Sequence, residues 1–507
     1  MTRKIKASIR YSVTALLVGS AIVMVGTLPV SAASSDATGA KGIQSASEQS
    51  SGDKPVAWSR FRGPNGSGLA ETGALPVEIG PESNVIWKTE LPPGHSSPIL
   101  SAERIFLTAF EGDLLFTYCL NRETGEVLWR REAPRSRTER IDPRNSPASP
   151  SPVTDGENVY VFFADFGILS YDLDGNERWQ HELGPFNNLY GMGASPILVD
   201  DAVVLVCDQG TDSYVVALAK KDGSVVWKTD RPEASSGHST PILWQPEGEP
   251  AQLLVPGSFF LTAYTVDTGE KIWWVSGLSF EMKSTPVIHK GVIFVNGYGS
   301  PINQPGNHVE MPPFEEALTE YDGDGDGYLS RAEVAGTQAA SWYDFVDRHQ
   351  DGQMDLADWN YLLAALASTN GMLAVRLGGS GDMTDESVIW TYHRAVPQLP
   401  SPLIYEDVLY MVNDGGIVTS FDAATGEVLD QGRLQGAVDS YYASPVAADG
   451  KIYFLSELGL QAVVEPGGAL KVVTVNDFDD LSYATPAIAD GRIYLRTRGA
   501  LYCLGLE

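Results

Sequence analysis

Short runs of apolar residues recur along the chain at a nearly constant spacing. Each run begins a few residues after a Ser-Pro or Thr-Pro dipeptide that is itself followed by an apolar residue. The prolines of these dipeptides are Pro98, Pro152, Pro196, Pro241, Pro286, Pro402, Pro445 and Pro486. Successive prolines lie 41 to 54 residues apart, apart from one interval of 116 residues after Pro286. Such a period indicates a repeat architecture.

Each repeat contains the signals for four short β-strands. Turn dipeptides such as Asp155-Gly156 and Asp449-Gly450 separate the apolar runs, and a strand that carries a tryptophan closes several repeats. These tryptophans are Trp129, Trp179, Trp227, Trp273 and Trp390. A lone four-stranded sheet cannot cover both apolar faces, but eight sheets arranged radially cover one another. Because proline lacks a ladder donor, it suits the first residue of each innermost strand.

The last repeat lacks its tryptophan strand, and a matching strand precedes the first repeat. This strand is residues 84–89, with Trp87 at its centre. Pairing it with the segment Leu501 to Leu506 would close the ring and satisfy the open edge of the eighth sheet. We therefore predict an all-β fold, an eight-bladed β-propeller closed by the N-terminal strand.

The long interval indicates an insertion in blade five, over residues 301–370. Residues 322–333 match the EF-hand calcium loop, in which oxygens on alternate residues converge on one ion. Gly327 permits the sharp bend, and Glu333 would bind the ion through both carboxylate oxygens. Helices are expected over residues 314–321 and 331–342. The predicted calcium ligands are Asp322, Asp324, Asp326, the Tyr328 carbonyl, Ser330 and Glu333.

A second loop, residues 347–358, departs from this pattern before a helix predicted over 359–367. His349 stands where an oxygen ligand is usual, and Asp358 replaces the long glutamate. The loop is therefore expected either to bind calcium weakly or to pair with the first loop without an ion. Its candidate ligands are Asp347, His349, Asp351, Gln353, Asp355 and Asp358.

The N-terminal segment predicts export from the cytoplasm, and the net charge disfavours nucleic acid as a partner. Residues 1–32 combine a basic start, an apolar run and small residues, as in a cleaved signal peptide. Residues 33–55 form a polar, Ser-rich spacer, and the propeller then occupies 56–300 and 371–507. The chain has a net charge of −30, and removal of four leader cations leaves about −34, which opposes binding to nucleic acid. We expect a periplasmic or secreted monomer without a stable membrane anchor.

The repeats resemble the PQQ-like, BamB-like β-propeller family. The motif TGxxxW of that family is present at residues 124–129 and 268–273, and WSRFRGPNGSG at residues 58–68 resembles the start of a secreted bacterial subgroup. Quinoprotein dehydrogenases of this kind hold the quinone PQQ between a Trp and a disulfide of adjacent cysteines. Here Cys119, Cys207 and Cys503 are far apart, in apolar runs typical of buried thiols. PQQ is therefore not expected as a cofactor, and calcium is.

The segments before each Ser/Thr-Pro connect the blades and should line one mouth of the central channel. Candidate ligand-binding residues in these segments are His95, Tyr190, Met192, His238 and Tyr441. The alternative is that they are turn residues repeated with the unit. No Ser-His-Asp order, HExxH motif or phosphate loop is present. The sequence favours a non-catalytic binding or scaffolding protein with an unknown protein or small-molecule ligand; the alternative is a PQQ-dependent dehydrogenase.

Overall fold

The computed structural model describes residues 58–299, 303 and 309–506. The predicted signal peptide and spacer, residues 1–32 and 33–55, lie outside the described residues. Within the described part of the chain, no helix is both long and apolar enough to cross a membrane.

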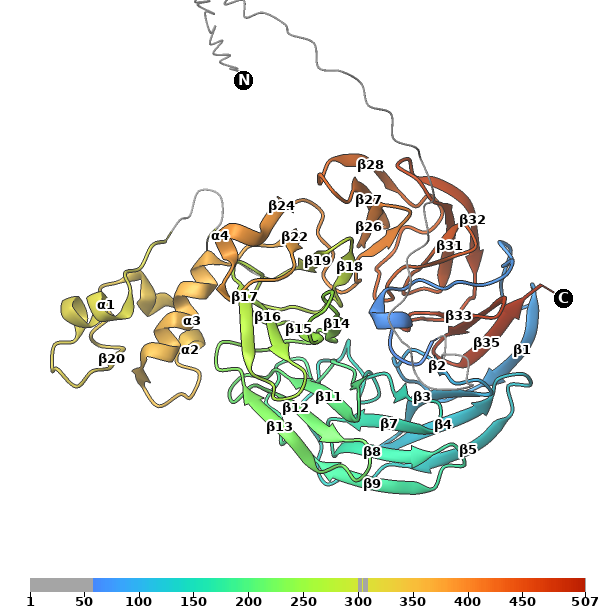
Figure 1. The fold of residues 1–507 in the computed structure, drawn as a ribbon, viewed down its shortest axis with the longest axis horizontal. Helices are drawn as coiled ribbons and strands as arrows, with labels where there is room; N and C mark the ends of the chain where they lie inside the picture. Colours follow the sequence, from blue (N-terminus) through green and yellow to red (C-terminus); the bar gives the residue numbers. More distant parts are fainter. Residues whose placement is uncertain (1–57, 300–302, 304–308, 507) are drawn as a thin grey trace, which may run out of the picture. The chain divides into compact units, whose positions relative to one another are not determined.

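Eight antiparallel sheets surround a central axis, which confirms the predicted propeller (Figure 1). The first four blades follow the chain order. Blade one is β2 (Ile99–Leu100), β3 (Arg104–Glu111), β4 (Leu114–Asn121) and β5 (Val127–Glu132); blade two is β6 (Val153–Thr154), β7 (Asn158–Phe163), β8 (Gly167–Asp172) and β9 (Glu177–Glu182). Blade three is β10 (Ile197–Val199), β11 (Ala202–Cys207), β12 (Tyr214–Ala219) and β13 (Val225–Asp230); blade four is β14 (Ile242–Trp244), β15 (Gln252–Pro256), β16 (Leu261–Thr265) and β17 (Lys271–Val275).

The remaining blades differ from this plan in two places. In blade five, the helical insertion separates the second strand from the third. Blade five is β18 (Val287–His289), β19 (Val292–Gly297), β22 (Gly371–Arg376) and β24 (Val388–Tyr392); blade six is β25 (Leu403–Tyr405), β26 (Val408–Asn413), β27 (Ile417–Asp422) and β28 (Val428–Arg433). Blade seven is β29 (Val446–Ala448), β30 (Lys451–Leu455), β31 (Leu460–Glu465) and β32 (Lys471–Asp477); blade eight is β33 (Ala487–Ala489), β34 (Arg492–Arg496), β35 (Ala500–Gly505) and β1 (Val85–Glu90).

The N-terminal strand closes the ring as predicted. Strand β1 runs antiparallel to β35, and Trp87 lies opposite Cys503. Cys503 and the other two cysteines are free and buried, also as predicted. Blade eight is therefore assembled from both ends of the described chain.

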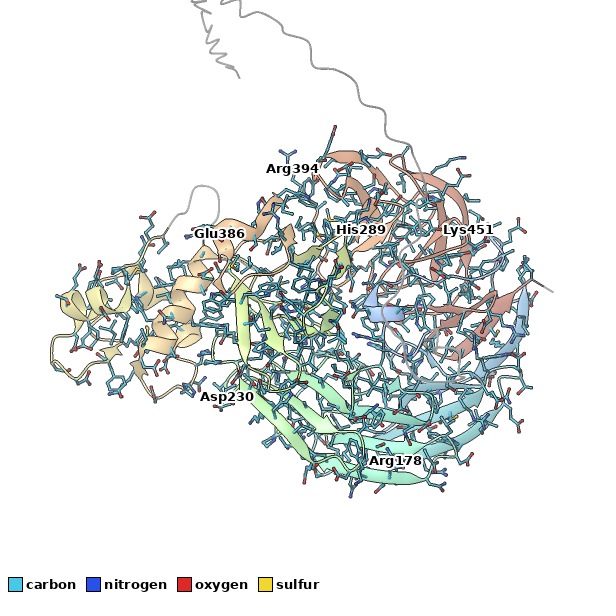
Figure 2. The ribbon with its side chains drawn as sticks, in the orientation of Figure 1. Arg178, Asp230, His289, Glu386, Arg394 and Lys451 are labelled. Atoms are coloured by element: carbon cyan, nitrogen blue, oxygen red, sulfur yellow. The ribbon has the colours of Figure 1, made fainter. Side chains whose placement is uncertain are left out.

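Tryptophans of the outer strands join neighbouring blades. The Trp87 ring lies against Gly125 in the turn of blade one, where a β-carbon at that glycine would lie 2.5 Å from the ring. The Trp87 Nε1–H also donates to the Arg122 carbonyl. Trp129, Trp179, Trp227 and Trp390 make the same pair of contacts with the next blade. Figure 2 shows Arg178, beside Trp179 on β9, at the periphery of the ring.

Trp273 is the exception among these tryptophans. Its Nε1–H donates to Gln252 within its own sheet. The turn that would receive it in blade five is replaced by a longer connection that contains α4 (Thr384–Ser387) and β23 (Gly381–Asp382). Strand β23 pairs in parallel with β17 and covers the outer edge of blade four.

A belt of hydroxyl groups joins the blades around the axis. In seven of the eight blades, the residue before the repeated proline donates its N–H to the hydroxyl of the equivalent residue in the next blade, as in Ser444 N–H to Thr485 Oγ1 at 3.0 Å. One of these seven bonds, from Thr485 N–H to Ser97 Oγ, joins the last blade to the first. The belt is interrupted at Thr285, whose buried hydroxyl has no hydrogen-bond partner among the described residues. Each Ser/Thr-Pro dipeptide thus supplies a bond between blades.

This belt gives a prediction with an internal control. Thr485→Val removes the acceptor for Ser444 N–H and should lower the free energy of unfolding by about 1–3 kcal/mol, because a buried donor loses its partner. Thr285→Val is the same change at the belt position without a bond and should alter stability by less than about 0.5 kcal/mol. Urea unfolding of the two variants measures the difference. Equal losses in both would contradict the assigned role of the belt.

The insertion contains two loops flanked by short helices. It comprises α1 (Phe314–Tyr321), β20 (Leu329–Ser330), η2 (Gln338–Trp342), α2 (Tyr343–Val346), β21 (Gln353–Met354) and α3 (Leu356–Ala367). Strands β20 and β21 pair and join the two loops. The prediction of one helix over residues 331–342 is wrong. Residues 331–336 form turns, and only Gln338–Trp342 is helical, as the 3-10 helix η2, whose N-terminus is capped by the Thr337 hydroxyl.

Candidate functional site

The first loop of the insertion gathers carboxylates at one point. One oxygen each from Asp322, Asp324 and Glu333 lies within 4.8 Å of the others, a spacing suited to a single ion. Gly325 and Gly327 bend the loop with φ of 75° and 86°. Calcium takes six to eight oxygen ligands, so these groups fit its chemistry.

Backbone donors hold these carboxylates in place. Gly323 N–H and Ser330 N–H donate to the two oxygens of Glu333, each at 2.8 Å. These hydrogen bonds, foremost that from Ser330, lower the pKa of Glu333 to about 2, so the group is ionised at any pH at which calcium would bind. Asp322 accepts N–H groups from Gly325 and Gly327. Asp326 accepts from Tyr328, whose exposed side chain leaves only its backbone carbonyl for an ion.

The second loop is arranged differently. Asp358 is buried at the start of α3, and its Oδ1 lies 3.7 Å from the Arg348 Nε. Asp355 caps α3, Asp347 accepts N–H groups within the loop, and His349, Asp351 and Gln353 are exposed. Among the described residues, no three acidic groups of this loop approach as closely as those of the first. This geometry favours the expected alternative of a loop that pairs structurally.

Arg348 also attaches the second loop to the propeller. Its Nη1 donates to the Pro232 carbonyl at 2.6 Å, and its guanidinium lies over the Tyr361 ring. Around Tyr361, Phe259, Phe280 and Phe345 form a cluster of aromatic rings with centroids 5.2 to 6.4 Å apart. The insertion is therefore fixed against blade four and the connections on both sides of it.

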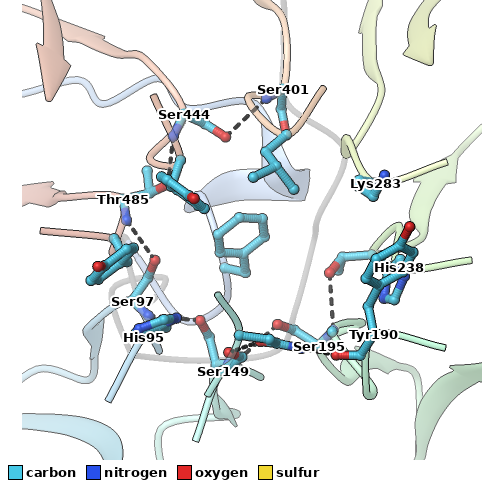
Figure 3. A pocket seen from close by; sticks show the side chains of 18 of the residues that line it. His95, Ser97, Ser149, Tyr190, Ser195, His238, Lys283, Ser401, Ser444 and Thr485 are labelled. Carbon is cyan, nitrogen blue, oxygen red and sulfur yellow. Dashed lines mark hydrogen bonds between the residues drawn. The ribbon is translucent and has the colours of Figure 1, made fainter. Parts of the chain in front are cut away.

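A cavity of about 230 Å³ lies on the propeller axis, inside the hydroxyl belt (Figure 3). His95, Tyr190 and His238 line it, as predicted. Met192 and Tyr441 do not line it, which corrects the prediction. Both are buried between blades, and the Tyr441 hydroxyl donates to the Ala437 carbonyl.

Their chain neighbours take these places in the wall. Gly193 follows Met192 and lines the cavity, and Tyr442 follows Tyr441. The sequence predicted the correct segments but not which residue of each faces the axis. Phe61 and Tyr483 were not predicted, and Lys283 lies in a predicted segment but was not among the candidate residues; no residue pattern indicates which way these side chains point.

The two histidines of the cavity are neutral at physiological pH. Burial, together with the nearby Arg496 and Arg498, lowers the pKa of His95 to about 3. Burial and Lys283 lower the pKa of His238 to about 3 as well. Two carboxylates beside the cavity are ion-paired, Asp142 with Arg144 at 2.8 Å and Glu281 with Lys283 at 2.5 Å, whereas Glu457 accepts a hydrogen bond from the Tyr483 hydroxyl at 3.1 Å.

These pKa shifts predict acid sensitivity. Unfolded histidine titrates near about 6.5, so between about pH 6.5 and 3 the unfolded chain binds more protons than the folded chain, and stability falls as pH is lowered through this range. Below about pH 6, we expect each of the two histidines to lower the free energy of unfolding by about 1 kcal/mol for each unit by which the pH falls. In urea unfolding between pH 7 and 5, His238→Gln should reduce this dependence, and His393→Gln, at an exposed site, should not. An unchanged dependence in His238→Gln would refute the burial of a neutral imidazole there.

Comparisons with known proteins agree with the fold. The PQQ_2 family, described as outer membrane protein assembly factor BamB, matches residues 80–210 and 360–507. Two curated proteins with that name, from Francisella salina and Francisella tularensis subsp. tularensis, are 24% and 22% identical over 159 and 162 residues, which is 30% of this chain in each case. The matched segments span only 28% and 32% of those relatives. The solved structure of BamB from Moraxella catarrhalis is similar with a TM-score of 0.51 at 12% identity, over 83% of this chain and 98% of that one.

Proposed function

We propose that this chain, which belongs to the family described as outer membrane protein assembly factor BamB, acts outside the cytoplasm as a non-catalytic scaffold with a calcium-binding insertion. The BamB-like propeller supports the scaffold role. The family description concerns outer membrane protein assembly, so the proposed partners are proteins of the cell envelope. The predicted leader and the acidic composition support the location.

The proposal that the protein is not an enzyme rests on the protonation state of the ionisable groups in the cavity. General acid–base catalysis needs a group whose pKa lies near the working pH. Here burial keeps both cavity histidines neutral, and two neighbouring carboxylates, Asp142 and Glu281, are ion-paired. An imidazole with a pKa of about 3 is a weak base at neutral pH, so these two histidines suit binding better than proton transfer.

The first loop carries the calcium part of the proposal. Asp322, Asp324, Asp326, Ser330 and Glu333 would supply side-chain oxygens, and Tyr328 its carbonyl. The ion would fix α1 against β20 and, through the β20–β21 pair, stabilise the insertion on the propeller. Extracytoplasmic calcium is abundant, so a structural role fits better than a switch.

Two measurements test the scaffold role against the dehydrogenase alternative. A photo-crosslinker at Leu356, which is 55% exposed on the insertion, should yield in envelope preparations a product that contains an outer membrane protein or a component of its assembly machinery. The protein incubated with PQQ and calcium should show no dye-linked alcohol oxidation. Oxidation that depends on added PQQ, or the absence of any crosslinked envelope protein, would contradict the proposed function.

A further inference from the structure

Two arginines near the start of the described chain lie beneath the cavity. Arg60 Nη2 donates to the Pro241 carbonyl at 2.6 Å, and Arg62 Nη2 donates to the Pro402 carbonyl at 2.8 Å. Phe61, between them in the chain, lines the cavity itself. Since Pro241 and Pro402 follow Thr240 and Ser401 of the cavity wall, each guanidinium lies directly behind that wall.

Arg496, at the end of β34 in blade eight, makes a similar contact. Its Nη1 donates to the backbone carbonyl of Ser96 at 2.9 Å and to its hydroxyl at 2.7 Å. Ser96 lies between His95 and Ser97, which both line the cavity. Guanidinium groups therefore contact three separate stretches of the wall.

These three positive charges are buried and lack acidic partners among the described residues. Arg60, Arg62 and Arg496 are 7%, 0% and 1% exposed, and none of them forms an ion pair within the described part of the chain. The Nε of each also has no hydrogen-bond acceptor there. Burial lowers the pKa of each to about 9, which leaves all three charged at neutral pH.

Three unpaired positive charges therefore lie next to the cavity of a strongly negative protein. The Asp142–Arg144 and Glu281–Lys283 pairs cancel, and the three arginines outnumber Glu457, the carboxylate that accepts a hydrogen bond from the Tyr483 hydroxyl of the wall. Charges in a medium of low dielectric act over longer distances than in water, and a concave site focuses their field. Uncompensated buried charge is costly, and an anion in the cavity would offset that cost.

The wall also offers aromatic surface and an imidazole nitrogen that has no hydrogen-bond partner among the described residues. The rings of His95 and Tyr483 stack with centroids 4.0 Å apart, and Tyr442 packs edge-on against Tyr483 at 5.1 Å. Across the cavity, the buried Nε2 of His238 has no hydrogen-bond partner among the described residues. Figure 3 shows His238 and Lys283 on the same side, opposite His95.

We propose that the axial cavity binds a small aromatic carboxylate. The three buried arginines attract the anion, His238 Nε2–H and Lys283 are placed to donate to its oxygens, and Tyr442 and Tyr483 contact its ring. Pockets for drug-sized ligands have volumes of about 300–1,000 Å³, so a cavity of about 230 Å³ suits a smaller molecule. This proposal concerns a different site from the calcium loop and does not rest on the scaffold role.

Calorimetric titration of the full protein with benzoate, benzyl alcohol and inorganic phosphate tests each part of the proposal. Benzoate should bind with one site per chain and at least about tenfold more tightly than either of the others, since benzyl alcohol lacks the charge and phosphate lacks the ring. Equal affinity for benzoate and benzyl alcohol would overturn the role of charge, and equal affinity for phosphate would overturn the role of the aromatic wall. No binding of benzoate would overturn the proposal entirely.

Variants locate the site. Arg60→Gln removes one uncompensated charge and should raise the Kd for benzoate about tenfold. Arg394→Gln removes the same charge at the periphery of the ring and should leave the Kd unchanged (Figure 2). Tyr442→Ala leaves all three arginines in place and should also raise the Kd for benzoate. This variant tests the site if Arg60→Gln does not fold. Unchanged affinity in both cavity variants would place benzoate elsewhere. Crosslinking and oxidation tests can fail without affecting these titrations.

Discussion

Trp87→Ala should destabilise the propeller by about 3–5 kcal/mol, the range for loss of a buried tryptophan. Trp87 contributes its ring to the contact with Gly125 and its Nε1–H to the Arg122 carbonyl, and it lies where the two ends of the described chain meet. Strand β1 precedes the first blade and is held mainly by β35. Loss of the Trp87 side chain should therefore release β1 from β35 and open the ring. Urea unfolding and limited proteolysis before residue 92 measure the two effects.

Trp390→Ala is the matched control for ring closure. Trp390 makes the same contact with Gly426 and donates to the Ala423 carbonyl, but its strand lies between covalently connected strands of successive blades. It should lower stability without increasing cleavage before residue 92. Equal proteolysis of the two variants would show that β1 plays no special part in closure.

Glu333→Gln should remove most of the stabilisation that calcium gives to the insertion. At a calcium concentration of about 100 times the Kd, binding to the folded state alone contributes about 2.7 kcal/mol. Glutamine keeps the size of the side chain but loses the charge and one of the two acceptor oxygens that bidentate binding requires. Calorimetry with calcium, and unfolding with and without calcium, measure the change.

Glu320→Gln is the control for this variant. Glu320 is exposed at the end of α1, close to the loop but outside the proposed ligands. It should bind calcium like the unaltered protein. If Glu333→Gln binds calcium as tightly as Glu320→Gln does, the assignment of the first loop is wrong.

The repeat pattern was sufficient to predict the ring and its closure. Regular Ser/Thr-Pro dipeptides and tryptophan strands gave eight blades, and the unmatched strand around Trp87 gave the closing pair. The role of the Ser or Thr before each repeated proline in the hydroxyl belt was not predicted. A bond such as that from Ser444 N–H to Thr485 Oγ1 joins residues of different blades and leaves no local signal in the sequence.

The cavity was predicted less well because its wall depends on tertiary packing. Met192 and Tyr441 were expected to face the axis, yet each is buried between blades and its neighbour faces the cavity. Irregular connecting segments have no fixed periodicity, so spacing does not indicate the direction of a side chain. Arg60 and Arg62 were recognised as part of a family-like motif, but burial without a carboxylate partner is visible only in three dimensions.

The cavity and the belt around it exist only if β1 closes the ring, and hydrogen exchange tests this most directly. In the unaltered protein, the hydrogen-bonded amides of Val85–Glu90 should exchange as slowly as those of their partner strand, Ala500–Gly505. In Trp87→Ala, both segments should lose protection together. Rapid exchange of Val85–Glu90 beside a protected Ala500–Gly505 in the unaltered protein would contradict the closed ring.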